Sequence, residues 1–262
     1  MPAADLLCVC MKPVWRTDVP LRLDAGGHGP LPGEAQQVAN AADLAALRLA
    51  LHLRDEAAAG AGTEVAQAEA AAAPRPGRLR VLALTVGPPA AEDVLREALA
   101  AGADEVLRVW GPAWPAQPPG VDATAALTRA HAAAAAAVLR PRRPLLVLAG
   151  ERSADTGHEC FGALLAAELG AAFAHRVTAL RRAAGDAGAG WEATVRLERG
   201  YGQPLRLAPP AVVTVSAQLP RPPQAPLPAW LASRAAPVPL AAADGAAPHP
   251  AQSALRVPRP RV

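Results

Sequence analysis

Three continuous apolar runs constrain the fold of this chain most strongly. They read LLCVC (6–10), RLRVLALTVG (78–87) and LLVLAG (145–150), and helical patterns separate them. Apolar runs without polar alternation are typical of parallel strands that are buried on both faces. Because strands and helices alternate in this way through residue 170, we predict an α/β fold. Its sheet should be doubly wound and mostly parallel, as in Rossmann-like folds.

The first connection between these strands has a recognisable helix start and a weak end. We expect Asn40 to cap a helix that runs to near Glu56, because asparagine is favoured at helix N-termini. Residues 57–77 are poor in bulky side chains and close on Pro-Arg-Pro-Gly. We predict a surface insertion over that stretch.

The pattern changes after residue 175. Four short strands, separated by glycine or proline, are predicted as antiparallel additions at the sheet edge: HRVTALRR (175–182), WEATVRLE (191–198), PLRLA (204–208) and AVVTVSA (211–217). From Gln218 onward the chain is rich in proline and has no period, which indicates an extended arm. We therefore predict an α/β domain over residues 1–217 and a C-terminal arm over 218–262.

Composition excludes several classes of partner. The formal net charge is +3, and the arginines are scattered without interleaved aromatic residues. We therefore expect no nucleic-acid partner. The N-terminal stretch lacks the basic start and long apolar run of a signal peptide, and no stretch approaches the roughly 20 apolar residues of a membrane span. We expect a cytoplasmic protein that is not integral to a membrane.

The three cysteines are Cys8, Cys10 and Cys160. An odd number in a chain of this size fits reduced thiols in a cytoplasm. Cys8 and Cys10 are expected to point to opposite faces of the first strand, which would prevent a disulfide between them.

The stretch ERSADTGHECFG (151–162) concentrates residues that could carry chemistry. His158, Glu159 and Cys160 are consecutive, and consecutive residues do not converge on one ion, so we predict no metal site. Cys160 as a nucleophile would need a nearby base, and a free cysteine is more often a small buried hydrophobe.

A nucleotide-binding loop fits this stretch better. It follows a strand and Gly150 and leads into a helix, which is where α/β folds bind nucleotides through backbone N–H groups. Asp155, Thr156 and Gly157 suit such a loop, whereas the carboxylate of Glu159 would repel a phosphate. An ordinary loop with a helix start remains the alternative.

Several motifs along the whole chain resemble the beta subunit of electron-transfer flavoproteins. They occur in the family's order over about residues 5–240, beginning with LLCVCMKPV and the Asn40-led helix. The most specific block is LTVGPPAAEDVLREALAAGADEVLRV, followed by LVLAGERSADTG, PAVVTV and PLPAWLASR.

The resemblance implies an electron-carrying subunit, not an enzyme, with no catalytic constellation of its own. Its partners would be an alpha subunit that holds most of the FAD, a donor flavin dehydrogenase, and a quinone reductase or similar acceptor. The beta subunit of this family buries an AMP. The matching positions here are Cys10, Asn40, Ala41, Asp43, Val86, Gly150, Ser153, Asp155, Thr156 and Gly157.

The resemblance also implies a docking segment, with Leu227 in the position of the family's anchoring leucine. Trp15 and Tyr201 are candidates for residues near the flavin. The second half of the loop departs from the family, because His158, Glu159, Cys160 and Phe161 replace residues that donate hydrogen bonds to phosphate. AMP, a second flavin and no ligand therefore all remain open at this site.

Two other functions remain as alternatives. One is a stand-alone adenine-nucleotide-binding domain similar to stress-response proteins, and the other is a scaffold that binds no nucleotide. The sequence names neither the donor dehydrogenase nor the final acceptor.

Overall fold

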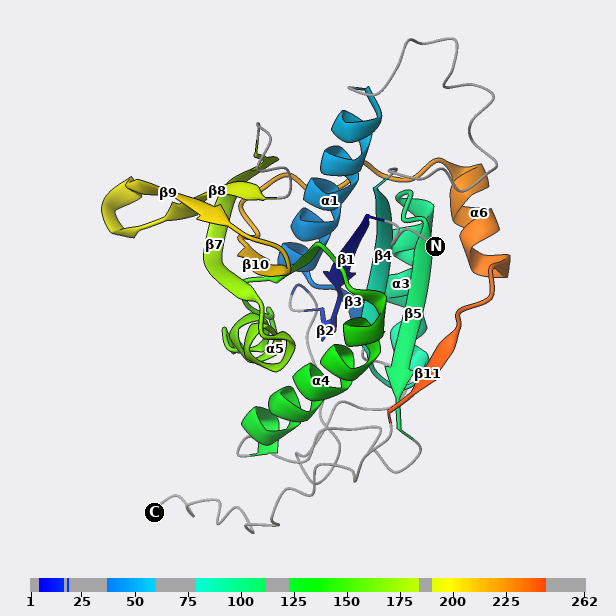
Figure 1. Ribbon diagram of the computed structural model, residues 1–262. Coiled ribbons are helices and arrows are strands. Elements are labelled where there is room, and N and C mark those ends of the chain that lie inside the picture. The colour runs from blue at the N-terminus through cyan, green and yellow to red at the C-terminus, as the bar shows by residue number, and fades with distance from the viewer. Residues whose placement is uncertain are drawn as a thin grey trace, which may run out of the picture.

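A nine-stranded sheet forms the centre of the protein (Figure 1). The computed structural model describes residues 5–16, 18, 37–59, 79–111, 123–183 and 190–243. In spatial order the strands are β11 (Leu240–Ala242), β5 (Glu105–Trp110), β4 (Arg80–Val86), β1 (Leu6–Cys10), β6 (Leu146–Gly150), β10 (Ala211–Val215), β7 (Ala172–Arg182), β8 (Trp191–Arg196) and β9 (Gly202–Leu207). All neighbours from β11 to β7 are parallel, and β8 and β9 are antiparallel. This confirms the predicted α/β class.

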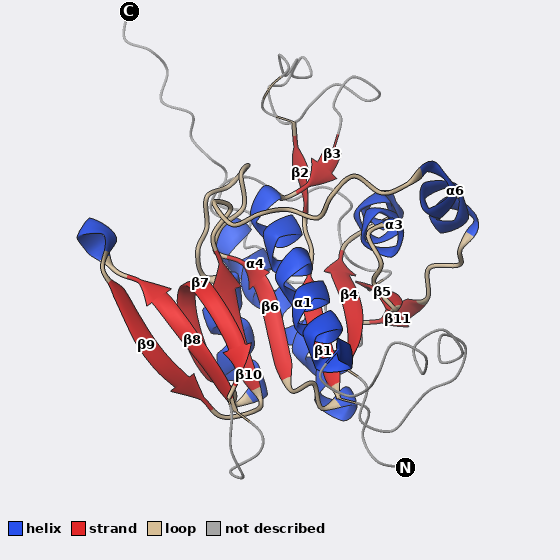
Figure 2. Cartoon of the chain, turned by 90° about the horizontal axis from the view of Figure 1, so that it is seen from above, coloured by secondary structure: helices blue, strands red, loops and turns tan. Residues whose placement is uncertain are grey.

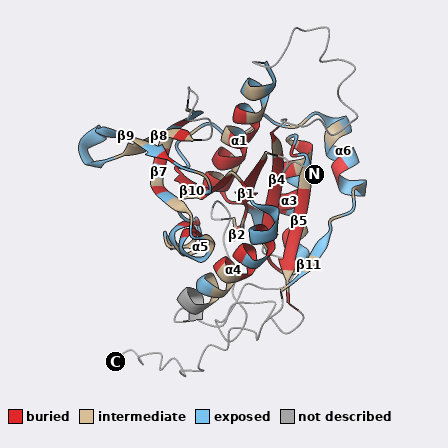
Figure 3. Cartoon of the chain, in the orientation of Figure 1, coloured by how far each residue is buried: buried red, intermediate tan, exposed pale blue. Residues whose placement is uncertain are grey.

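Helices cover both faces of the parallel strands, so the sheet is doubly wound. One core packs under α1 (Ala41–Ala59) and α3 (Glu92–Ala100), and the other under α4 (Ala123–Leu139) and α5 (Phe161–Leu169). Alternate residues of each buried strand belong to different cores, as the two-residue period of a strand requires. Figure 3 shows the buried centre of the sheet and the exposed elements at both ends.

The expectation for Cys8 and Cys10 was wrong. Residues two positions apart on a strand share a face, and both cysteines lie in the core under α4 and α5. All three cysteines are nevertheless free thiols.

The stretch AVVTVSA is not an antiparallel edge strand. It forms β10, which is fully buried and lies between β6 and β7 with parallel pairing to both. Its valines fit this central position because a strand buried on both faces is continuously apolar. The antiparallel part of the sheet is therefore limited to β8 and β9, which extend beyond β7 at one end (Figure 2).

The C-terminal arm is more regular than its proline content predicted. It crosses to the opposite end of the sheet, forms α6 (Leu227–Ala235) against α3, and adds β11 beside β5 (Figure 2). The first helix was predicted to end near Glu56, before an insertion over residues 57–77. In the structure α1 continues to Ala59, so the first residues of the expected insertion are helical. Residues 60–77 of that insertion lie outside the described residues.

A small second sheet pairs β2 (Pro13–Trp15) with β3 (Gln37–Ala39). These strands connect β1 to α1. They bring the carboxyl end of β1 and the amino end of α1 together, because the amide of Asn40 donates to the carbonyl of Lys12 over 3.0 Å.

Candidate functional site

The candidate site lies where the direction of the sheet connections reverses. From β1 the chain moves outward to β4 and β5, and then crosses to β6 on the other side of β1. Cys10 is level with Ala149 in the parallel pairing of β1 with β6. The loops after two neighbouring strands therefore diverge at this point, and α/β sheets bind ligands in such crevices.

Asp43 joins the two sides of this crevice. One carboxylate oxygen accepts a hydrogen bond from the amide of Lys12 (2.7 Å), after β1, and the other accepts from the amide of Gly150 (2.8 Å), at the end of β6. The side chain is buried, and burial raises the pKa of Asp43 to about 7 although its three hydrogen-bond donors act in the opposite direction. Its place in the first turn of α1 favours a negative charge.

Asn40 makes a second connection, to the loop after β6. Its side-chain amide donates to the carbonyl of Arg152 (2.9 Å) and to Asp43 Oδ1 (3.2 Å), while its Oδ1 accepts from the amide of Ala154 (3.2 Å). The predicted helix start is correct, since α1 begins at Ala41. The side chain, however, bonds to the loop over a separation of more than a hundred residues and positions it.

Gly150 has no room for a side chain. A Cβ at this position would lie 2.3 Å from Asp43 Oδ1, 2.8 Å from the Cβ of Ala42 and 3.0 Å from Asn40 Nδ2. The glycine is therefore required by the close approach of α1 to the end of β6. Below, Asn40, Asp43 and Gly150 are called the clamp.

The first half of the loop is fixed by short hydrogen bonds. The hydroxyls of Ser153 and Thr156 lie 2.6 Å apart, and the Asp155 carboxylate accepts from the amide of Thr156 at 2.7 Å. Gly157 adopts a positive φ of 67°, where glycine has no steric cost. The Nζ of Lys12 forms an ion pair with Asp155 (2.7 Å), so β1 also contacts the outer side of the loop.

Both ends of the loop contact β7. Glu159 Oε2 lies 3.4 Å from His175 Nε2, and Glu151 Oε2 lies 3.5 Å from Arg176 Nε. Arg176 has a positive φ of 58°, and it lies beside the register shift between β7 and β10. Each acidic residue of the loop thus has a positively charged or ionisable partner on another element, including Lys12 for Asp155.

The remaining predicted site residues lie around the clamp. Ala41 is the first residue of α1, and Val86 ends β4, on the other side of β1 from β6. Cys10 is buried in the core under α4 and α5, where the neighbouring Cys8 thiol and burial raise the pKa of the Cys10 thiol. The structure therefore brings Asn40, Asp43 and the loop together, while the thiol of Cys10 belongs to the core.

The two aromatic candidates lie at different places. Trp15 belongs to β2, which follows β1 in the sequence and so is near the residues of the crevice along the chain. Tyr201 lies in the turn between β8 and β9 and is 70% exposed. Among the described residues, no group of three His, Cys, Asp or Glu side chains is arranged to bind a metal ion. Within the same residues, no helix is both long and apolar enough to cross a bilayer.

The arrangement suits a ligand bound by the loop backbone. Asn40 and Asp43 use their polar groups on protein partners, so they hold the loop rather than contact a ligand. The exposed residues of the loop are Arg152, Ala154, Asp155, Thr156, Gly157 and Glu159. Asp155 and Glu151 are paired with Lys12 and Arg176, which lowers their repulsion of a phosphate.

Sequence reasoning did not assign Lys12, His175 and Arg176 to this site. A lysine directly after a buried strand was a usable signal for Lys12, because polar residues at strand carboxyl ends line such crevices. The pairing of β7 beside β10 brings His175 and Arg176 to the loop, and no pattern in the sequence indicated that pairing.

Leu227, the predicted anchor, is the first residue of α6 and is 67% exposed. Trp230 and Leu231 follow on the same helical face and are 46% and 55% exposed. On the other side of α6, Arg96 of α3 donates to the carbonyls of Ser233, Arg234 and Ala236, each over 2.9 Å. The end of α6 is therefore attached to α3 while its apolar face is open.

Comparison with known proteins gives one family. The model of the electron transfer flavoprotein domain matches residues 63–246, which is well over half of the chain and includes β4 to β11 and α6. A search of curated proteins found no match. The parallel sheet with helices on both faces is consistent with this match. The chain belongs to the electron transfer flavoprotein domain family.

Proposed function

We propose that this chain is the beta subunit of a heterodimeric electron-transfer flavoprotein. In this role it accepts electrons from a flavin dehydrogenase and passes them to a quinone reductase or similar acceptor, in the cytoplasm. The family match, which continues through α6 and β11, supports an electron-transfer flavoprotein, and the order of the beta-type motifs from LLCVCMKPV to PLPAWLASR supports the choice of the beta subunit.

FAD, shared with and mostly held by an alpha subunit, supplies the electron-carrying chemistry when bound. This chain contributes a rigid edge to that complex. Electron transfer requires that the two redox centres approach closely, and it requires no acid or base. A carrier subunit therefore needs only to hold its elements in position. The clamp provides it, because Asp43 and Asn40 join β1, α1 and β6 through hydrogen bonds of 2.7–3.2 Å.

AMP is the ligand that we propose for the crevice at the clamp. Support comes from its position at the reversal of the sheet connections and from the glycine-dependent approach of α1 to β6. The loop backbone would bind the phosphate, and Arg152 would supply positive charge near it, while Lys12 offsets the charge of Asp155. Extraction of ligands from the purified protein would distinguish AMP from a second flavin and from no ligand.

Docking of the donor dehydrogenase is assigned to α6. Leu227 would enter an apolar pocket of that partner, with Trp230 and Leu231 beside it, since exposed apolar side chains on one helix face are typical of docking sites. Arg234 stacks over Trp230 at 5.1 Å from the ring centre and also pairs with Asp93 of α3.

Co-expression with an alpha-type subunit from the same genome tests the proposal. We expect an equimolar yellow complex on size-exclusion chromatography, from which acid extraction releases FAD and AMP. A yellow complex without AMP would remove the nucleotide assignment and keep the carrier. A colourless chain that ignores the alpha-type subunit and retains adenine nucleotide would instead identify a stand-alone binding domain.

A further inference from the structure

A bulge in β7 lies beside the loop that follows β6. The parallel pairing of β7 with β10 shifts register between Ala174 and Val177. In this shift Thr214 of β10 alone lies opposite His175 and Arg176. Arg176 has a positive φ of 58°, a conformation that is unfavourable for a residue with a side chain. Such strained bulges occur next to functional sites, where they redirect side chains.

The hydroxyl of Thr214 fixes both residues of this bulge. Thr214 is fully buried, and its Oγ1 accepts a hydrogen bond from the amide of Arg176 over 3.1 Å. The same oxygen lies 2.8 Å from Nδ1 of His175. Because the Arg176 amide can only donate, the hydroxyl proton of Thr214 is available to His175 Nδ1. A neutral imidazole that accepts at Nδ1 carries its own proton on Nε2.

His175 and Arg176 extend from the bulge to the two ends of the loop. Nε2 of His175 lies 3.4 Å from Glu159 Oε2, so an N–H of the ring is available to this carboxylate whether the ring is neutral or charged. Nε of Arg176 lies 3.5 Å from Glu151 Oε2, and the other oxygen of Glu151 accepts from the hydroxyl of Ser216 over 3.1 Å. Both glutamates therefore have protein partners, and a paired carboxylate repels a nearby phosphate less than a free one.

The methyl group of Thr214 has a different contact. A Cβ on Gly162 would lie 2.4 Å from Thr214 Cγ2, so the first turn of α5, directly after the loop, packs closely on β10. The methyl group therefore packs against α5, while the hydroxyl fixes the bulge. Because serine and valine each retain one of these two groups, substitutions at this position can separate the two contacts.

We infer that Thr214 is a positioning residue of the crevice. Its hydroxyl fixes the bulge and, through His175 and Arg176, keeps the carboxylates of Glu159 and Glu151 on protein partners. The loop can then offer its backbone N–H groups to a phosphate. This inference rests on the proposed nucleotide site, and it identifies the residue that makes the loop compatible with an anion.

Amide exchange of the loop tests the positioning in the full chain without added nucleotide. Thr214→Val replaces the hydroxyl by a methyl group, and Thr214→Ser retains the hydroxyl and removes the methyl group. We expect exchange over residues 151–159 to become about tenfold faster in Thr214→Val and to stay within about threefold of wild type in Thr214→Ser. Thr214→Ser should instead lower the melting temperature, because a buried methyl group is lost. Equal loop exchange in the two variants would overturn the inference.

Binding of AMP and adenosine tests the electrostatic part, because the two ligands differ only in the phosphate. In Thr214→Val the Kd of AMP should rise about tenfold, and the Kd of adenosine should rise less than about threefold. Adding Glu151→Gln/Glu159→Gln to Thr214→Val removes both loop carboxylates and should return the Kd of AMP to within about threefold of wild type.

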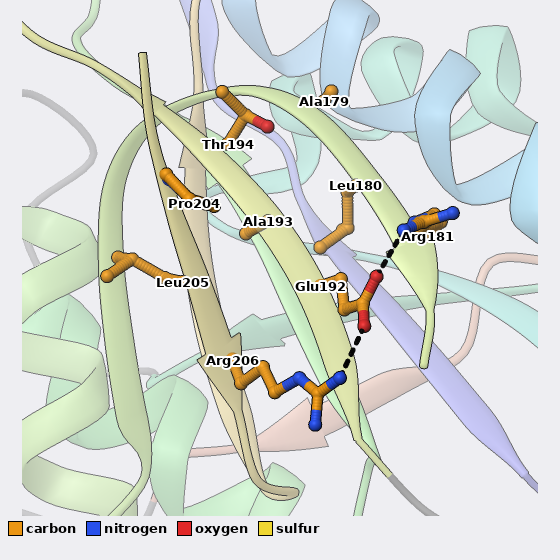
Figure 4. A pocket seen from close by; sticks show the side chains of 9 residues that line it. All are labelled: Ala179, Leu180, Arg181, Glu192, Ala193, Thr194, Pro204, Leu205 and Arg206. Atoms are coloured by element: carbon orange, nitrogen blue, oxygen red, sulfur yellow. Dashed lines mark hydrogen bonds and ion pairs between the residues drawn. The ribbon is translucent and has the colours of Figure 1, made fainter. Parts of the chain in front are cut away.

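Glu192 provides a matched control for the loss of a carboxylate. It lies between Arg181 and Arg206 further along β7 and its neighbouring strands, as Figure 4 shows. Adding Glu192→Gln to Thr214→Val should therefore restore no affinity for AMP. Equal losses for AMP and adenosine in Thr214→Val, or recovery by Glu192→Gln as large as that by the loop substitutions, would overturn the inference.

The proposed nucleotide site and the role of Thr214 fail in different ways. If the wild-type chain binds neither AMP nor adenosine, the nucleotide assignment fails, and loop exchange alone decides whether Thr214 positions the loop. If the wild-type chain binds AMP and Thr214→Val binds it equally well, the nucleotide site stands and the inference about Thr214 is wrong.

Discussion

Replacing Gly150 by alanine should disrupt the clamp more than any other single methyl group. The new Cβ would lie 2.3 Å from Asp43 Oδ1 and 2.8 Å from the Cβ of Ala42, well inside van der Waals contact. Ala42 belongs to the buried first turn of α1 and cannot move alone. The Asp43 carboxylate must therefore move away from the amides of Lys12 and Gly150.

The expected loss follows from those contacts. Leaving a buried donor without its acceptor costs about 1–3 kcal/mol, and two amides lose Asp43. Overpacking against Ala42 adds about 1–3 kcal/mol. The sum is about 3–9 kcal/mol, a large part of the roughly 5–15 kcal/mol by which domains are stable. The loop after β6 should loosen at the same time, because Asn40 lies 3.0 Å from the new atom.

Urea unfolding measures this loss, with Gly157→Ala as the matched control. Gly157 has a positive φ but no atom within 4 Å of an added Cβ, so alanine there should cost only about 1 kcal/mol. In the double variant Asp43→Ala/Gly150→Ala, the carboxylate clash is absent, and the combined loss should be smaller than the sum of the two single losses. Equal midpoints for Gly150→Ala and Gly157→Ala, or additive single losses, would refute the clamp.

Three further predictions concern pH, the arm and docking. Because burial raises the pKa of Asp43 from 3.8 to about 7, the folded chain binds more protons in this window, and the free energy of unfolding should fall as pH rises through it. Asp43→Asn should flatten that slope in urea titrations, whereas stability rising with pH in wild type would mean that the three donors outweigh burial. Arg96→Gln removes the donor to three carbonyls of α6 and should speed amide exchange in α6 about tenfold. Arg234→Gln removes the exposed pair with Asp93 and the contact with Trp230 but no hydrogen bond to these carbonyls, so it should not. Leu227→Ala should leave the melting temperature nearly unchanged, since the side chain is 67% exposed, and should lower kcat/KM with the donor dehydrogenase about tenfold; an unchanged kcat/KM would remove Leu227 as the anchor.

Local sequence patterns predicted the parallel core well. The strands LLCVC and LLVLAG are continuously apolar because both of their faces are covered by helices, and that pattern survives in any parallel arrangement. The same argument applied to AVVTV, yet its position after three short segments predicted as antiparallel strands suggested an edge. The strand order that places β10 between β6 and β7 depends on long-range packing, which a local pattern does not contain.

The candidate site was predictable in its glycine and in its polar loop. The hydrogen bonds that hold the loop in place were less predictable. Asn40 has the residue type of a helix cap, but its partners are Arg152 and Ala154, far away in the chain. The arm shows the same limit, because its prolines indicated an extended segment while α6 is stabilised by Arg96 from another helix.

The flavin content of the purified complex tests the central claim most directly. When this chain is co-purified with an alpha-type subunit, absorbance and acid extraction should give equimolar FAD, this chain and the alpha-type subunit. The chain alone should be colourless and unable to retain FAD. A chain that binds no alpha-type subunit and adds no flavin to any complex would contradict its assignment as half of an electron-transfer flavoprotein.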